Sequence, residues 1–390
     1  MPLSESALFR MLRDLVADEL GRIGDRPDAA AWSLGTALDG PAVGADSLDL
    51  TTLATAVNER FRLHEAGNED FLLRYRTLGD WVGLAREALW EGTSGLGFRT
   101  SGTTGVPKLV THTWGALDAE LDALATLFPE VSRVVALAPA HHIYGFLYTV
   151  ALPERWAVPV VDGDAAWATV HSDLQPGDLI VTIPERWRYL AGTRTAFPAG
   201  VSGVSSTAPL DPQVYRGLLD RGLARLTEVY GATETGGVGF RTAPEAVFSL
   251  LGHWQRGADD RLEPAANWLQ RDAIAPMDRL RWIGERQFRP EARHDGAVQV
   301  GGTNVHPETV AETLRRHAWI RDAEVRPAST PGGTRLQAII VLAGDAPEAD
   351  AAEAELRRWI EASFPAPQRP RSLTFAAQLP DADPASLPTG

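Results

Sequence analysis

The sequence predicts an α/β protein with more than one domain. A chain of 390 residues, 44% of them apolar, is long enough for two or three domains. Val134–Ala138 is a continuous apolar run typical of a buried strand, and Asp178–Thr182 predicts another. We expect a helical domain over residues 1–90, an α/β core over 91–294 and a small α+β domain over 295–390.

Composition excludes several classes of function. The net charge of -14 argues against nucleic acid as a partner, because binding of phosphate backbones requires a basic face. The absence of cysteine excludes disulfides, thiolate metal sites and a catalytic thiol. The chain shows neither a charged-then-apolar leader nor a long apolar run. A cytoplasmic protein without a membrane span is therefore expected.

The first 90 residues predict three helices. Apolar residues recur at helical spacing over residues 4–20 and again from Leu50 to Phe61. Asp46 or Ser47 is expected to cap the second helix, and a third helix is expected from Thr77 to about Trp90. The glycines between residues 92 and 97 predict a flexible junction.

Residues 98–113 read FRTSGTTGVPKLVTHT and predict a loop that binds polyphosphate. Its hydroxyl groups can donate to an anion, its glycines let backbone N–H groups approach, and Lys108, the single lysine of the chain, supplies positive charge. The spacing is not that of a Walker loop. The loop residues with these properties are Thr100, Ser101, Gly102, Thr103, Thr104, Gly105 and Lys108. The alternative is an ordinary Gly/Thr surface turn.

A second motif follows at residues 226–237, LTEVYGATETGG. The two motifs, in this order, resemble the adenylate-forming superfamily, which includes acyl- and aryl-CoA ligases, adenylation domains of peptide synthetases and luciferases. The resemblance implies that Tyr230 stacks on adenine, that Gly231 belongs to the nucleotide site, that Thr233 binds the α-phosphate and that Glu234 holds Mg²⁺. A carboxylate that attacks phosphorus brings two anions together, so hydroxyl donors and a divalent cation suit this chemistry.

The resemblance assigns further residues to one site around ATP and the acid substrate. Residues Ser206, Thr207, Ala208 and Pro209 would lie against adenine. Asp278 and Arg293 would bind the ribose, and Asp295 would be the hinge of the C-terminal domain. His142 would gate the site, and Tyr144, Gly236 and Gly237 would line the acid pocket with it. Packing in the core is the alternative for His142 and Tyr144.

The first 90 residues also resemble an acyl carrier protein. Gly44–Leu50 reads GADSLDL, and in that family the serine of Asp-Ser-Leu carries a 4′-phosphopantetheine arm. Ser47 is thus the candidate attachment site, where the positive end of a helix would favour a phosphodiester. The alternatives are that Asp46 and Ser47 only cap a helix, or that an unmodified carrier fold serves for docking.

The last 96 residues resemble the mobile lid of the same superfamily. Strands near 298–300, 322–326 and 336–342 and helices over 308–317 and 351–364 are expected. The lid usually ends in a lysine that reaches the α-phosphate, and the printed chain stops at Gly390, where that lysine would follow. Either the chain is cut there, which we prefer, or it is a natural form; both interpretations predict slow adenylation.

These observations predict a ligase that uses ATP and Mg²⁺ to convert a carboxylic acid, with a hydroxybenzoate-like aromatic acid as first choice, into an acyl-adenylate. The acyl group would pass to the phosphopantetheine of an acyl carrier protein, its own or a separate one, as in aryl-polyene and xanthomonadin-type pigment pathways. One alternative is an acyl-CoA ligase that uses free CoA. Another is a non-catalytic protein that binds nucleotide and docks carriers.

Overall fold

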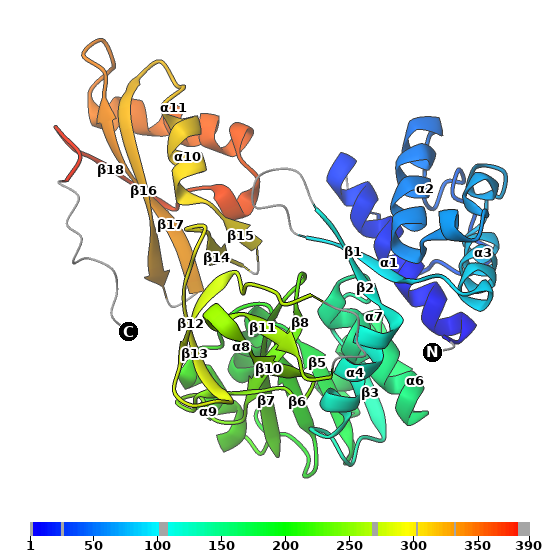
Figure 1. Ribbon diagram of the computed structural model, residues 1–390. Helices are drawn as coiled ribbons and strands as arrows, with labels where there is room; N and C mark the ends of the chain where they lie inside the picture. The colour runs from blue at the N-terminus through cyan, green and yellow to red at the C-terminus, as the bar shows by residue number, and fades with distance from the viewer. Residues whose placement is uncertain are drawn as a thin grey trace. The chain divides into compact units, whose positions relative to one another are not determined.

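The computed structural model describes residues 3–24, 27–100, 108–266, 272–301, 303–330 and 333–380 (Figure 1). The chain divides into two compact units, with the boundary between Glu291 and Ala292. The first unit contains the N-terminal helices and the large sheet, and the second contains the C-terminal strands and helices. The two units are described separately.

Three N-terminal helices confirm the helices expected from apolar spacing: α1 Glu5–Ile23, α2 Ser47–Phe61 and α3 Leu78–Glu91. Short 3₁₀ segments, η1 Leu63–Glu65 and η2 Glu69–Leu73, connect the last two. Asp46 rather than Ser47 caps α2, because its carboxylate accepts from the backbone of Leu48 and Asp49. Thr77 and Asp80 form the corresponding reciprocal cap of α3.

The N-terminal helices share their core with the sheet that follows. Leu8 and Trp81 belong to the same buried apolar cluster as Leu117, Phe146 and Val204. Residues 3–100 are part of the first compact unit, so the boundary expected after residue 90 does not coincide with a boundary between units. The carrier-like character of this segment remains a prediction.

The predicted flexible junction at 92–97 is wrong, because these residues lead into a hairpin whose first strand is mostly buried. Strand β1, Gly95–Arg99, pairs in antiparallel fashion with β2, Leu109–Thr113. A Cβ atom at Gly97 would lie 2.2 Å from the carbonyl oxygen of Glu59 in α2. The glycine therefore permits the close packing of the strand on the helix, not flexibility.

Nine strands of the described residues form one mixed sheet in the order β12-β13-β9-β8-β7-β6-β5-β3-β4. The strands from β7 to β4 in this order are parallel. The pairs β7–β8, β8–β9 and β9–β13 are antiparallel. The strands are β3 Arg133–Ala136, β4 Val160–Val161, β5 Asp178–Thr182, β6 Ser202–Ser205, β7 Arg225–Ala232, β8 Gly236–Arg241, β9 Phe248–Leu250, β12 Asp278–Trp282 and β13 Gln287–Arg293.

Both faces of the parallel strands are covered. Val134 and Leu179 face the cluster that includes the N-terminal helices, while Val135 and Ile180 face a second cluster around Trp187. Because alternate residues of β3 and β5 face two different buried clusters, both sets are apolar, and these strands appear in the sequence as continuous apolar runs. The intervening helical segments are α4 Trp114–Ala125, α5 Ile143–Gly145, η3 Phe146–Ala151, α6 Leu152–Trp156, α7 Gly163–Ser172, α8 Pro184–Thr193 and α9 Pro212–Asp220. A small hairpin of β10 Trp254–Arg256 and β11 Leu262–Pro264 follows β9, with the short turn η4 Ala258–Asp260 between them.

The second unit has its own core and the elements expected of a small α+β domain. A hairpin of β14 Val298–Val300 and β15 Thr303–Val305 precedes α10 Pro307–Leu314. Strands β16 Ile320–Thr330, β17 Gly333–Leu342 and β18 Ser372–Phe375 form a sheet, and α11 Ala349–Ser363 and η6 Ala366–Gln368 lie between the last two strands in sequence. Leu314, Ile340 and Leu356 are buried in one cluster that joins the helices to the sheet.

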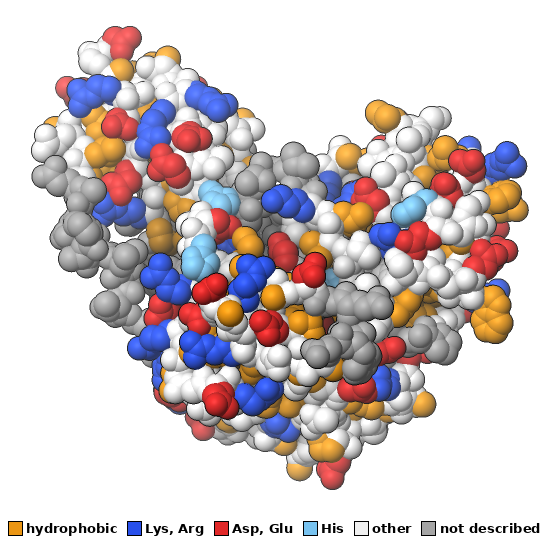
Figure 2. Space-filling model, in the orientation of Figure 1, with side chains coloured by type: hydrophobic (Ala, Val, Ile, Leu, Met, Phe, Trp, Pro, Cys, Tyr) orange, Lys and Arg blue, Asp and Glu red, His pale blue; other side chains and the backbone are white. Residues whose placement is uncertain are grey.

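Among the described residues, no helix combines the length and the apolar character needed to cross a bilayer. On the face shown in Figure 2, acidic and basic side chains are interspersed. Such a mixture differs from the basic stripe that nucleic-acid-binding proteins present.

Candidate functional site

The candidate site lies where several parallel strands of the first unit end. Strand β3 lies between β4 and β5 in the sheet. The chain therefore goes from β3 to its neighbour on one side, β4, and then crosses to its neighbour on the other side, β5. At such a reversal of strand order, ligands of α/β sheets bind outside the carboxyl ends of the strands. His142 lies in the segment after β3, Ser206 directly follows β6, and Tyr230 lies near the end of β7.

The structure describes the two residues that flank the predicted polyphosphate-binding loop, Thr100 and Lys108, although most of the loop lies outside the described residues. The backbone N–H of Thr100 donates to the carbonyl of Lys108 at 2.8 Å, and the N–H of Lys108 donates to Oγ1 of Thr100 at 3.1 Å. The side chain of Lys108 is exposed. The expected loop residues Ser101, Gly102, Thr103, Thr104 and Gly105 belong to the undescribed part of the chain.

The hairpin that carries this loop is bonded to the second motif. His112 of β2 is buried, and its Nε2 lies 2.7 Å from the carbonyl oxygen of Thr233. The imidazole also packs edge-on against Phe98 of β1. Two segments 121 residues apart in sequence are thereby joined beside the predicted phosphate-binding residues. Sequence patterns did not reveal His112, since nothing in the neighbouring sequence distinguishes it from an ordinary strand residue.

The turn between β7 and β8 holds Thr233 and Glu234, both half-buried. Oγ1 of Thr235 accepts from the N–H of Ala232 at 3.1 Å, which closes the turn. The glycines that follow were expected to admit the carboxylate of a substrate. That expectation remains a prediction; the side chain that packs against these glycines in the structure is Glu120 of α4, whose Oε1 accepts from the N–H of Gly237 at 2.5 Å. Gly236, with φ +69°, leaves the space that this carboxylate fills.

Tyr230 and Asp278 meet at the other end of the motif. The hydroxyl of Tyr230 donates to Oδ2 of Asp278 at 2.8 Å, although 48 residues separate them. The ring of Tyr230 packs against Phe248 and Phe288. The residue proposed to contact adenine and the residue proposed to bind ribose therefore lie side by side, as binding of one nucleoside requires.

The turn after β6 combines burial with an unusual backbone. Oγ of Ser206 donates to the carbonyl of Val229 at 2.8 Å, which ties the turn to β7. Thr207 has φ +80°, in the left-handed region that β-branched residues rarely adopt. Such conformations persist where surrounding structure imposes them, frequently at ligand sites. Ala208 is half-buried and Pro209 is exposed.

The two histidines after β3 have different surroundings. His142, the predicted gating residue, is exposed and lines a small pocket together with Arg60 of α2 and Arg99 of β1. His141 is buried, and its Nε2 lies 3.5 Å from Oδ2 of Asp18 in α1. The N-terminal helices thus contribute directly to the surroundings of His142.

Tyr144 is a core residue in this structure. Its side chain is 7% exposed, and its hydroxyl donates to the carbonyls of Thr182 at 2.9 Å and Val204 at 3.0 Å. Both acceptors are the backbone of parallel strands. The hydroxyl therefore stabilises the sheet, in agreement with the packing alternative.

Arg60 is a buried cation that sequence patterns did not reveal. Its guanidinium lies 4.2 Å from the centroid of Phe98 and donates to the carbonyl of His141. Burial, and secondarily the charge of Arg99, lower the pKa of Arg60 to about 9. The one signal in the sequence was that Arg60 lies among the positions that form the inner face of α2. This signal can be read only when it is known which face of the helix is buried.

Ser47 is exposed as the first residue of α2. This position is compatible with modification, and it is equally that of an ordinary residue after a cap. Attachment of phosphopantetheine remains a prediction.

The residues around Glu234 fit Mg²⁺ bound mainly through the substrate. In the described ranges, no group of three or more His, Cys, Asp or Glu residues could hold a metal ion. Mg²⁺ commonly takes one or two carboxylates and completes its shell with phosphate oxygens and water. A single half-buried carboxylate beside a phosphate-binding turn suits that mode.

In the second unit, Arg293 and the predicted hinge residue Asp295 form a bidentate pair. Nε and Nη2 of Arg293 lie 2.9 Å and 2.7 Å from the two carboxylate oxygens. The hydrogen bonds from Arg293, opposed by partial burial and assisted by the N–H of Ala297, lower the pKa of Asp295 to about 2. Such a pair holds the segment after the unit boundary in one conformation.

The ion pair between Arg293 and Asp295 is expected to weaken at low pH, when Asp295 is protonated. Because the pKa of Asp295 is lower in the folded than in the unfolded chain, the stability it contributes is complete above about pH 4 and is lost as the pH falls toward 2. In Arg293→Gln we expect the pKa of Asp295 to rise toward about 4. Carboxyl ¹³C NMR titration measures both values, with Arg358→Gln on α11 as control. An unchanged pKa in Arg293→Gln would show that another group stabilises the carboxylate.

Comparison with known proteins identifies the family. Residues 98–262 match the family model of AMP-binding enzymes. Over 385 residues the chain is 42% identical to a 4-coumarate–CoA ligase of Halorhodospira halophila, with 97% of each chain covered. A 4-coumarate–CoA ligase of Rhodobacter capsulatus is 40% identical, with 95% of this chain and 96% of that protein covered. The chain belongs to the AMP-binding, adenylate-forming enzymes.

The fold of this family is also found in solved structures. A malonyl-CoA ligase, solved as a ternary product complex with methylmalonyl-CoA and AMP, superposes with a TM-score of 0.57 at 22% identity, covering 74% of this chain and 72% of that one. As an adenylate-forming acid–thiol ligase, the protein activates a carboxylic acid with ATP and transfers the acyl group to a thiol. The predicted superfamily is thus confirmed.

Proposed function

We propose that the protein ligates a 4-coumarate-like aromatic acid to free CoA at the expense of ATP. The identity of 42% over 97% of both chains with a 4-coumarate–CoA ligase carries this proposal. The sequence first favoured a hydroxybenzoate-like acid and a carrier protein as acceptor. The relatives favour the alternative, since both are named for CoA as acceptor.

In the first step, a carboxylate oxygen of the acid attacks the α-phosphorus of ATP. The new P–O bond gives the acyl-adenylate, and pyrophosphate leaves with the electrons of the broken bond. Tyr230 and Asp278, which are hydrogen-bonded to each other, would hold the nucleoside. The hydroxyl of Thr233 and the ammonium of Lys108 would donate to phosphate oxygens, and Mg²⁺ bound at Glu234 would neutralise their charge.

In the second step, the deprotonated thiol of CoA attacks the acyl carbon, and AMP leaves. His142, which is exposed as the N-cap residue of α5, would separate the entry of the two substrates. We propose that the second unit turns about Asp295 between the steps. Its own core allows it to move as one body.

An acid panel tests the proposal. The full chain is incubated with ATP, Mg²⁺ and 4-coumarate, cinnamate, 4-hydroxybenzoate or a fatty acid, and pyrophosphate release and hydroxylamine-trapped adenylate are measured. We expect the highest kcat/KM with 4-coumarate. To follow the second step separately, the synthetic adenylate of each acid is also supplied with CoA, and thioester formation is measured. Preference for another acid class in both assays would refute the substrate assignment.

The acceptor is tested in parallel. CoA and a phosphopantetheinylated carrier protein are compared at equal concentration, and the chain is treated with a phosphopantetheinyl transferase and CoA before mass spectrometry. We expect CoA to be the faster acceptor. A faster carrier protein, or a pantetheine-sized mass gain that Ser47→Ala abolishes, would favour the carrier pathway. Nucleotide binding without turnover in any assay would support the non-catalytic alternative.

A further inference from the structure

Glu19 of α1 is a buried acidic residue, only 4% exposed. A carboxylate in such a position is costly unless charged partners and hydrogen bonds compensate it. Oε1 of Glu19 accepts from Nη1 of Arg99 at 2.9 Å, although 80 residues separate the two in sequence. Arg99 is the last residue of β1. The pair therefore joins α1 to the strand that leads into the predicted polyphosphate-binding loop.

Arg99 is also bonded to α2. Its Nε and Nη2 each lie 2.7 Å from Oε2 of Glu59. The same glutamate packs its carbonyl oxygen against Gly97, two residues earlier in the strand. Two helices thus hold one guanidinium, and hydrogen bonds between charged groups are among the strongest that side chains make. The end of β1 is fixed to both helices through this one side chain.

The end of β1 is in turn bonded to Lys108. Thr100 follows Arg99 directly, and its N–H donates to the carbonyl of Lys108. Oγ1 of Thr100 accepts from the N–H of Lys108, which leaves the hydroxyl proton of Thr100 able to donate to an anion. On the other strand, Arg99 is paired with Leu109, the neighbour of Lys108. A displacement of Arg99 would therefore move both residues that are proposed to bind phosphate.

Glu19 also balances neighbouring cations. Its Oε1 lies 3.8 Å from Nη1 of Arg22. Burial, and then the charge of Arg99, lower the pKa of Arg60, and the charge of Glu19 partly offsets them. Removal of this carboxylate would therefore affect the stability of the helices as well as the position of Arg99. Glu59 is 32% exposed at its side chain, so its replacement is the milder test of the same contact.

We propose that Glu19 and Glu59 are positioning residues for the binding of ATP. Through Arg99 they hold Thr100 and Lys108 where these two residues bind the β- and γ-phosphates. A binding site reaches its full affinity only when surrounding residues fix the groups that touch the ligand. The inference rests on the proposed role of Thr100 and Lys108, and it is independent of the acid and of the acceptor. The N-terminal helices, which resemble a carrier domain in sequence, thereby support the nucleotide site.

Comparison of ATP with AMP tests the proposal, because AMP lacks the β- and γ-phosphates. Dissociation constants are measured by calorimetry on the full chain with Mg²⁺ and without an acid. We expect Glu59→Gln to raise that of ATP about ten-fold, the usual effect of losing one hydrogen bond between charged groups, and to leave that of AMP unchanged. By charge alone, removal of a carboxylate near the site would tighten the binding of ATP, so weaker binding indicates positioning. Glu19→Gln should weaken it further.

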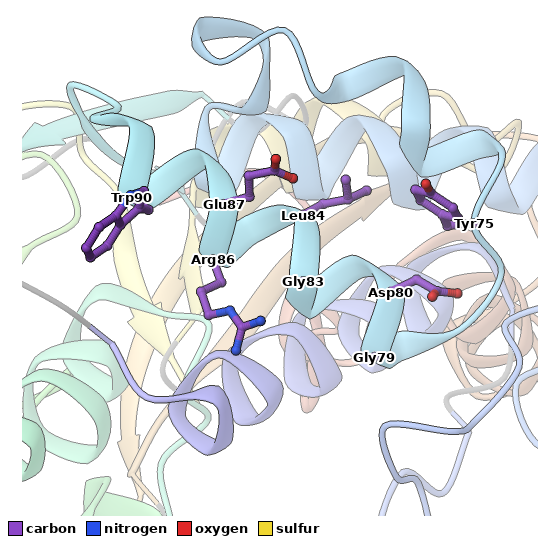
Figure 3. Close-up of a pocket in the computed structure, with 8 residues that line it drawn as sticks. All are labelled: Tyr75, Gly79, Asp80, Gly83, Leu84, Arg86, Glu87 and Trp90. Carbon is purple, nitrogen blue, oxygen red and sulfur yellow. The ribbon is translucent and has the colours of Figure 1, made fainter.

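Glu87→Gln is the matched control. It makes the same change on α3, where Glu87 is exposed and lines a separate shallow groove (Figure 3). It should leave both dissociation constants unchanged.

Lys108→Gln separates this proposal from the function on which it rests. It removes the ammonium group itself and should weaken ATP but not AMP. If it leaves the affinity for ATP unchanged, the proposed role of Lys108 is wrong and the positioning role falls with it. If Lys108→Gln weakens ATP and Glu59→Gln does not, the positioning role alone is overturned. An equal loss of ATP and AMP affinity in Glu59→Gln would also overturn it, because it would show a general distortion. Circular dichroism must show Glu19→Gln to be folded; if it is not, Glu59→Gln decides.

Discussion

Replacement of Glu234 by glutamine is expected to reduce acid-dependent pyrophosphate release about 100- to 1,000-fold, the usual cost of losing one charged group that stabilises the transition state. Glu234 is the carboxylate next to Thr233 in the turn between β7 and β8. Glutamine keeps the size of the side chain but removes the negative charge that would hold Mg²⁺. The loss should appear in kcat, and raising Mg²⁺ should recover part of it.

Glu130→Gln is a suitable control, since it makes the same chemical change at an exposed position outside the site. It should retain the wild-type rate. A Glu234→Gln protein that is as active as wild type at low Mg²⁺ would show that the carboxylate has no part in metal binding. The assignment carried over from the family motif would then be wrong.

The second large effect is expected for Gly236→Ala, which should lower the free energy of unfolding by about 2–5 kcal/mol through left-handed backbone strain and overpacking. A Cβ atom at this position would lie 2.2 Å from Oε2 of Glu120, and φ is +69°. Neither the backbone nor the buried carboxylate can yield freely, because Oε1 of Glu120 is bonded to the N–H of Gly237. Urea unfolding measures the change.

Gly115→Ala on α4 is the matched control, because an added Cβ atom there would meet nothing within 4 Å. In a helix this change is expected to stabilise by about 0.5–1 kcal/mol. A double-mutant cycle with Glu120→Ala should show strong coupling to Gly236→Ala, since the two residues are in contact. Additive effects would indicate that backbone strain, and not the carboxylate, dominates the cost.

Local patterns predicted the secondary structure well. The helices α1, α2, α3, α10 and α11 and the buried strands β3 and β5 lie where apolar spacing placed them. Helix period and capping depend on residues within a few positions of each other, so they can be read from a single chain. The flexible junction expected around Gly95 and Gly97 is wrong, because a glycine needed for close packing looks the same in sequence as one in a flexible linker.

The sequence by itself determined the chemistry: the threonine-rich loop that ends in Lys108 and the Tyr230–Glu234 motif already indicated an adenylate-forming enzyme. Only the tertiary structure decided how the site is built. The bond between His112 and Thr233, the pair of Tyr230 and Asp278, and Glu120 beneath Gly237 join residues 121, 48 and 117 positions apart. Such contacts depend on the order of the strands in the sheet, which no local pattern specifies. For the same reason the N-terminal helices, which resemble a separate domain in sequence, share one buried core with the sheet.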